Sequence, residues 1–472
     1  MPTALPCMPS APWPSSLLLA QESVAVEGQL GYLFERLFTP TGIAAAAALS
    51  GLLVLVFIIR KPLPILGGVV MALGTSVLPD RVEVNQLIGP LQSLRFLSKS
   101  VAFALLGIVV FLGLPGTLRG NRIRSAGAAA TAFLVFQLLY TLQLMLFAGD
   151  GFMKGAFGIV AIAMMYLTYA VGFGRRMQDR ESAISVLEVF AWVGVAFAAM
   201  NSIQIVLGLS GALVGGRLAG VAGNAQMMGG ISACLIVANA YLYAELPITR
   251  PLRWVCLACV GVLSIFLLAT GSRTAVLAVS AALFVMFRLQ VGRFAILGIV
   301  ALIAYSAVSL FLESPTEAVA ERLSSGADTR TAIWLDALGR FLGSPIFGEL
   351  MFLRPGDSPS GVESTVFRTL ANMGLIGGIA LLFPVFAAAG CALKSISLAR
   401  ERPEYARLVD FQLGALTVIL VLNLFDGYAF GFLTFPVLFI YVVLALGAFL
   451  AEQAEAIPGA VLDDDGLLVP GY

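Results

Sequence analysis

The residues in this chain that could do chemistry are carboxylates, arginines and hydroxyl groups, because histidine is absent from all 472 positions. Without an imidazole, there is no side chain of this type to bind a metal or transfer protons near neutral pH. Arg273 stands out, because Gly271-Ser272-Arg273 interrupts two apolar runs with almost no loop. A guanidinium at that depth is costly unless it is paired or faces water, and its planar fork matches the oxygens of a diphosphate.

Six further arginines lie, like Arg273, on the side of the predicted spans where positive charge is normally scarce. They are Arg217, Arg322, Arg330, Arg340, Arg354 and Arg368. We hypothesise that Arg217 and Arg273, with arginines of a long loop, form a site for a lipid-linked diphosphate. The simpler interpretation is favoured for exposed loop arginines such as Arg340, which can be solvated or paired with Asp336. For Arg273, its depth favours the binding role.

The elements that position these residues follow from composition. Hydrophobic residues make up 59% of the chain and charged residues 12%. Soluble domains are about one-quarter charged, so we predict an all-helical, polytopic integral membrane protein. Apolar runs of about twenty residues predict roughly thirteen spans: 41–59, 62–78, 99–116, 126–149, 152–173, 183–207, 227–245, 254–270, 274–289, 294–312, 367–389, 410–425 and 429–450. Twelve is the alternative, because the first two could form one re-entrant hairpin.

The charges of the connections predict the orientation of the chain. The basic connections, among them Arg175/Arg176/Arg180 and Arg250/Arg253, all fall on one side if the spans alternate, which makes that side cytoplasmic. The net charge is +1 and no basic stripe is present, which argues against nucleic acid as a partner. The predicted organisation is an external segment 1–40, spans in 41–312, an external loop 313–366, spans in 367–450 and a cytoplasmic tail 451–472.

The long loop carries helix signals of its own. A capping box that begins at Ser314 opens a short helix ending near Gly326. Asp328 can cap a second helix over 329–342, which a glycine and a proline terminate. Its apolar positions share one face and are Trp334, Leu338, Phe341 and Leu342. The pattern predicts amphipathic helices on the outer membrane surface, as a lid or platform. Trp334 could stack on a sugar ring there, although anchoring in the interface is the commoner role.

Four segments together resemble the signatures of the O-antigen ligase and polymerase superfamily. Thr270–Ala275 (TGSRTA) is similar to its SRTA-type motif, and Arg217–Gln226 (RLAGVAGNAQ) resembles a loop usually written RLxGxxGNPN. Arg330–Trp334 and Ser344–Gly348 (SPIFG) are similar to its external R…W…PxxG pattern. The likeness covers about residues 200–380, and the order and shared external placement of the motifs carry it.

This resemblance implies a glycosyltransferase C-type fold and an enzyme that needs no metal or other cofactor. It implies a donor glycan carried on undecaprenyl diphosphate at the outer face of the bacterial cytoplasmic membrane. The partners would be this lipid-linked oligosaccharide and the bilayer, together with a flippase and a chain-length regulator. Arg217, Arg330, Arg354 and Arg368 would bind the diphosphate-linked substrate, and Arg273 would be catalytic, because it could stabilise the charge of the departing diphosphate.

One departure from the superfamily pattern concerns the catalytic base. Ligases have a histidine at the end of the long loop, and Glu363 occupies that place here, with Gly374 and Gly377 at the family spacing. A partly desolvated carboxylate could accept a proton from a sugar hydroxyl, so Glu363 is the candidate base and polymerase the favoured activity. The alternatives for Glu363 are an ion pair with Arg368 or Arg354, or a helix cap.

Other assignments remain open at this stage. Asp357 is a rival carboxylate for the base, and Asp426 and Tyr428 could line the same cavity from between the last two spans. A ligase that transfers the glycan to another acceptor is the alternative activity. A transporter of lipid-linked oligosaccharide is the third, but transporters favour internal repeats and charged residues within spans, and the sequence shows neither clearly.

Overall fold

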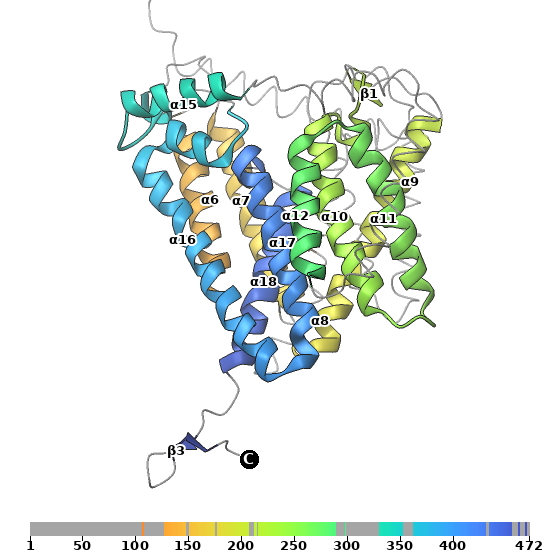
Figure 1. Cartoon of the computed structure of the whole chain (residues 1–472). Helices are drawn as coiled ribbons and strands as arrows, with labels where there is room; N and C mark the ends of the chain where they lie inside the picture. The colour runs from red at the N-terminus through yellow and green to blue at the C-terminus, as the bar shows by residue number, and fades with distance from the viewer. Residues whose placement is uncertain are drawn as a thin grey trace, which may run out of the picture.

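The chain is folded as a bundle of long helices (Figure 1). The computed structural model describes residues 106–107, 127–147, 151–174, 177–206, 212–214, 216–288, 298, 330–352, 362–430, 434–455, 461–462 and 468–469. Within them, the long helices are α6 (Ala128–Phe147), α7 (Gly151–Leu167, continued by the π-helix η2, Thr168–Phe173), α9 (Val189–Val206), α10 (Ala225–Glu245), α11 (Pro251–Ala269), α12 (Arg273–Phe287), α16 (Thr365–Glu401), α17 (Ala406–Phe425) and α18 (Phe435–Glu455).

These helices account for nine of the predicted spans. Seven helical segments of the described part are long and apolar enough to cross a membrane, and two shorter apolar helices, Gly155–Ala170 and Arg273–Phe287, accompany them. The prediction of a polytopic helical protein is confirmed at this level. The four remaining predicted spans (41–59, 62–78, 99–116 and 294–312) lie outside the described residues, apart from 106–107 and 298.

The core of the bundle surrounds α10 and α18. In their most apolar windows, 94% and 89% of the residues are buried, against 22% for α16. A helix that is apolar on all sides is stable only when it is surrounded, which is why these two are central. Around them α11 packs on α10, α12 packs on α17, and α6 packs on both α7 and α16. Because α16 and α6 flank the bundle, many of their apolar side chains remain exposed, as at Phe386 and Leu146.

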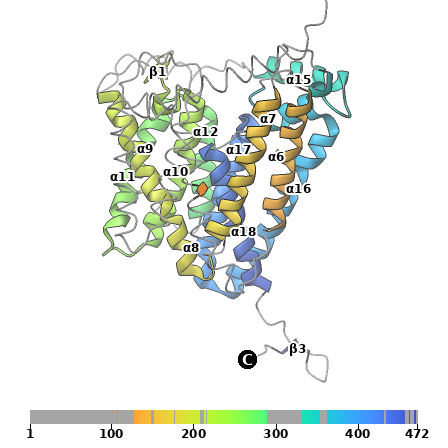
Figure 2. The same ribbon diagram turned by 180° about the vertical axis from the view of Figure 1, so that it is seen from behind.

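The two ends of the bundle differ in character. At one end lie α15 (Thr331–Gly343) and the hairpin of β1 (Leu213–Val214) and β2 (Arg217–Leu218), as Figures 1 and 2 show. The other end carries α8 (Arg180–Leu187) and, beyond the bundle, the paired strands β3 (Val461–Leu462) and β4 (Leu468–Val469). Here arginines of the predicted cytoplasmic connections meet carboxylates: Arg180 and Arg407 with Glu245, Arg250 with Glu188, and Arg288 with Asp410.

The loop helix α15 lies across the end of the bundle, beside the start of α16 (Figure 1). It begins two residues later than the predicted 329, with Arg330 as its N-cap, so the assignment of that cap to Asp328 was wrong. It ends at Gly343, one residue beyond the predicted 342. The apolar face is divided: Ala337 is buried, whereas Leu338 and Leu342 remain exposed. The preceding predicted helix near 314–326 lies outside the described residues.

Candidate functional site

Four helices begin close together at the end of the bundle that carries α15. Three of them start at a residue whose side-chain oxygen accepts a hydrogen bond from a backbone N–H of the first turn. Before α10, Asn224 accepts from the backbone N–H of Gln226. Ser272 accepts from that of Ala275 before α12, and Ser364 from that of Phe367 before α16. The fourth is α15. Helix N-termini carry partial positive charge, so their convergence makes this end attractive to an anion.

Glu363 lies at this end of the bundle, two residues before the start of α16. Its Oε2 accepts a hydrogen bond from the side-chain amide of Gln226, with 2.7 Å between Nε2 and Oε2. The side chain is exposed rather than desolvated, and within the described residues Glu363 forms no ion pair. The interpretation of Glu363 as a helix cap is wrong, because Ser364 takes that position. An accessible, oriented carboxylate is what a proton acceptor requires.

Arg330 enters the bundle between α12 and α17. Its guanidinium donates to Thr274 Oγ1 at 2.9 Å and to Asp426 Oδ1 at 3.2 Å, and it lies 5.6 Å from the centre of the Phe425 ring. Asp426 is only 4% exposed. Burial raises the pKa of its carboxyl from 3.8 to about 7; Arg330 opposes that rise and Glu363 adds to it.

Arg217 and Arg273 belong to neighbouring segments. Arg217, on β2, donates from Nε to the carbonyl oxygen of Thr270 at 2.7 Å. That carbonyl lies three residues before Arg273, the first residue of α12. Arg273 is exposed in the described part of the chain. The energetic cost of burying its charge, which singled it out in the sequence, therefore does not arise there. The two arginines are therefore brought to one region, with the guanidinium of Arg273 accessible.

Arg368 and Trp334 contact aromatic rings. The Arg368 guanidinium donates to Tyr140 Oη at 3.3 Å and lies 4.8 Å from the centre of the Phe430 ring. The predicted ion pair of Arg368 with Glu363 is absent from the described residues. Trp334 stacks on Phe367 with ring centres 5.0 Å apart, a contact that attaches α15 to α16. Arg354 and Asp357 lie outside the described residues.

A break in α16 docks the Ser344–Gly348 segment. Gly374 has φ 61° and ψ −153°, which interrupts the helix and frees backbone amides. The carbonyl oxygens of Pro345 and Ile346 accept from the Leu375 and Ile376 amides at 2.8 and 3.3 Å. The loop therefore supplies the partners that the interrupted helix lacks. This contact fixes the C-terminal side of α15 beside the start of α16.

Sequence reasoning did not find the partners of these side chains. Gln226 entered only as a departure from a motif, and Tyr140 and Thr274 were not singled out. Asp426 was expected to line the same cavity as Glu363, but the sequence did not predict that it would pair with Arg330. An acidic residue directly after an apolar span was the available signal for Asp426, because burial there demands a cationic partner. Within the described chain, no group of three or more Cys, Asp or Glu side chains converges that could hold a metal ion.

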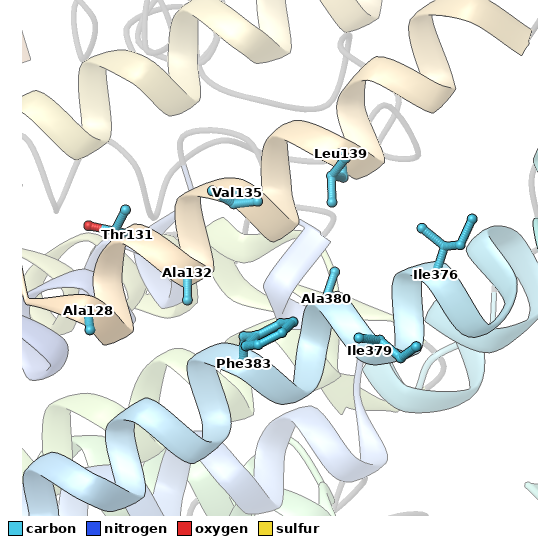
Figure 3. A pocket seen from close by; sticks show the side chains of 9 residues that line it. All are labelled: Ala128, Thr131, Ala132, Val135, Leu139, Ile376, Ile379, Ala380 and Phe383. Atoms are coloured by element: carbon cyan, nitrogen blue, oxygen red, sulfur yellow. The ribbon is translucent and has the colours of Figure 1, made fainter.

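A separate groove of about 620 Å³ opens between α6 and α16 (Figure 3). Alanines 132 and 380 lie in it, and Val135, Ile379 and Phe383 flank them. Thr131 contributes the one hydroxyl among the lining side chains. Because this groove contains no charged or titratable group, the polar cluster at the helix N-termini is the candidate site.

Comparison of the chain with protein-family models gives no match, and comparison with curated proteins gives none either. The four motif segments therefore remain a resemblance to the superfamily. The structure does bring three of the four motif segments into contact with one another, and the fourth docks on α16. Arg217 reaches Thr270, Thr274 reaches Arg330, and the Ser344–Gly348 segment reaches α16.

The raised pKa of Asp426 predicts a pH-dependent stability. Between about pH 4 and pH 7 the folded chain holds a proton on Asp426 that the unfolded chain has lost, so stability falls as the pH rises through this window and levels off above it. Asp426→Asn mimics the protonated form and removes this contribution. We expect the variant to melt at a higher temperature than the wild type, by a small margin at pH 5 and by a larger one at pH 8.

The control for these melts is Asp336→Asn, which changes an exposed carboxylate on α15. It should leave the difference between pH 5 and pH 8 as in the wild type. A wild-type and an Asp426→Asn curve that stay parallel over the whole range would contradict the assignment.

Proposed function

We propose that this chain is a glycosyltransferase that joins lipid-diphosphate-linked saccharide units, as a polysaccharide polymerase, in the bacterial cytoplasmic membrane. The observation that carries the proposal is that four helices begin at one end of the bundle, where Arg217, Arg273 and Arg330 and the accessible carboxylate of Glu363 also lie. Positive charge suits a diphosphate, and the carboxylate suits a sugar hydroxyl. The end with α15 then faces outward.

In the proposed reaction, the donor diphosphate binds among these positive groups. A hydroxyl of the acceptor sugar loses its proton to a Glu363 oxygen as its own oxygen attacks the anomeric carbon of the donor. The bond from that carbon to the diphosphate oxygen breaks, and the electron pair leaves with the lipid diphosphate. Arg273, exposed at the start of α12, is placed to stabilise this leaving charge. Gln226 orients the Glu363 carboxylate for the proton transfer.

Arg273→Gln should lower polymer formation by roughly 10²- to 10³-fold, the usual cost of removing one group that stabilises developing charge. The measurement is the size distribution of surface and secreted polysaccharide in a strain that lacks the gene, complemented with each variant at equal membrane abundance. The matched control is Arg340→Gln, because Arg340 lies on the same end of the molecule but pairs with Asp336 and Glu349 on the outer side of α15.

The product pattern also separates the candidate activities. Loss of long chains, with single repeat units still transferred, supports a polymerase. Full-length polymer that stays on its lipid carrier would instead show a ligase. Normal chain length with Arg273→Gln would remove Arg273 from the site.

A further inference from the structure

Asp426 connects three helices that meet at the site. It directly follows α17, and its carboxylate pairs with Arg330, the N-cap of α15, at 3.2 Å. Its carbonyl oxygen accepts from Thr365 Oγ1 at 3.2 Å, on the first residue of α16 and two positions after Glu363. Arg330 in turn donates to Thr274, the residue after Arg273 on α12. Asp426 thus contacts the N-cap of α15 directly. It also contacts Thr365, near Glu363, and is linked through Arg330 to Thr274, next to Arg273.

We propose that Asp426 is a positioning residue: its carboxylate holds Arg330, and so holds α15 in register with the starts of α12 and α16. Its catalytic consequence rests on the proposed function. Asp426 is too buried to touch a substrate, with 6% of its side chain exposed, so it acts through Arg330. A buried ion pair of this kind can fix the relative position of the two segments that it joins, even where it adds little to the free energy of unfolding.

The physical reason lies in how Arg330 would behave without the Asp426 carboxylate. Arg330 is 27% exposed and sits beside Phe425, so without a counter-charge its guanidinium gains by moving into water. Arg330 immediately precedes α15, so this movement would pull the first turn of the helix from the bundle. Trp334, one turn further on, would still hold α15 to α16 and α17 through its contacts with Phe367 and Phe425.

The test is hydrogen–deuterium exchange of residues 331–343 at pH 8, where the Asp426 carboxyl is charged, in the full-length protein in lipid nanodiscs; it needs no substrate. We expect Asp426→Asn and Arg330→Gln each to speed exchange by roughly ten-fold or more, the factor for losing a charge-assisted hydrogen bond. The double variant should exchange no faster than either single variant, because both remove the same contact. Asp426→Glu keeps the carboxylate and should retain most of the protection.

Asp336→Asn is the matched control, because it breaks an exposed ion pair on α15 itself and should leave exchange unchanged. Wild-type exchange in both Asp426→Asn and Arg330→Gln would overturn the proposal. Where transfer is measured, Asp426→Asn should raise KM for the lipid-linked donor more than it lowers kcat. Faster exchange in a protein whose wild type transfers no sugar would support the positioning role and refute the proposed function.

Discussion

Glu363→Gln is expected to abolish chain growth, with transfer slower by roughly 10²- to 10⁴-fold, the usual contribution of a general base. Glutamine has nearly the shape of glutamate and can still contact Gln226, so the fold at the start of α16 should be preserved. What is lost is the capacity to take the proton of the attacking hydroxyl. The measurement is single-turnover transfer from a lipid-linked donor in proteoliposomes, where binding and chemistry can be separated.

The control is Glu349→Gln, because Glu349 is also a glutamate at this end of the molecule but is engaged with Arg340. It should transfer at close to the wild-type rate. Asp357→Asn is the second arm, since Asp357 is the rival carboxylate of the same loop. Normal transfer by Glu363→Gln together with loss in Asp357→Asn would move the base to Asp357.

Gly374→Ala is expected to have the largest effect on structure. The backbone at Gly374 has φ 61°, a region that a residue with a Cβ occupies only under strain. An added Cβ would also lie 2.5 Å from the carbonyl oxygen of Ile346, so the docked Ser344–Gly348 segment would have to move. We expect a destabilisation of about 3 kcal/mol or more, seen as a lower melting temperature and less folded protein in the membrane.

The same substitution elsewhere in α16 provides the control. Gly390 has ordinary helical geometry, and nothing lies within 4 Å of the position its Cβ would occupy. Gly390→Ala should therefore be neutral or stabilising by up to about 1 kcal/mol, through helix propensity. Equal melting temperatures for Gly374→Ala and Gly390→Ala would show that the loop does not depend on the break in α16.

The resemblance to the superfamily identified residues near the candidate site, and the structure shows which contacts these residues make. The motif spacing singled out Gly374, with nine residues between it and Ser364, but it gave no reason for a glycine there. The reason is the docking of the Ser344–Gly348 segment onto the interrupted helix. In the same way, Gln226 replaces the usual asparagine of its motif, and the structure places its amide on Glu363.

The sequence by itself determined the helical class and the placement of nine spans, whereas the capping residues Asn224, Ser272 and Ser364 became evident only in the structure. The class and the spans are local features, because span length and hydropathy depend on residues a few positions apart. Only the tertiary structure decided which side chains meet. Gln226 and Glu363 are 137 positions apart, Arg330 and Asp426 are 96 apart, and Arg368 and Tyr140 are 228 apart. Such pairs arise from how helices pack, and hydropathy carries no information about it, since apolar faces fit several neighbours equally well.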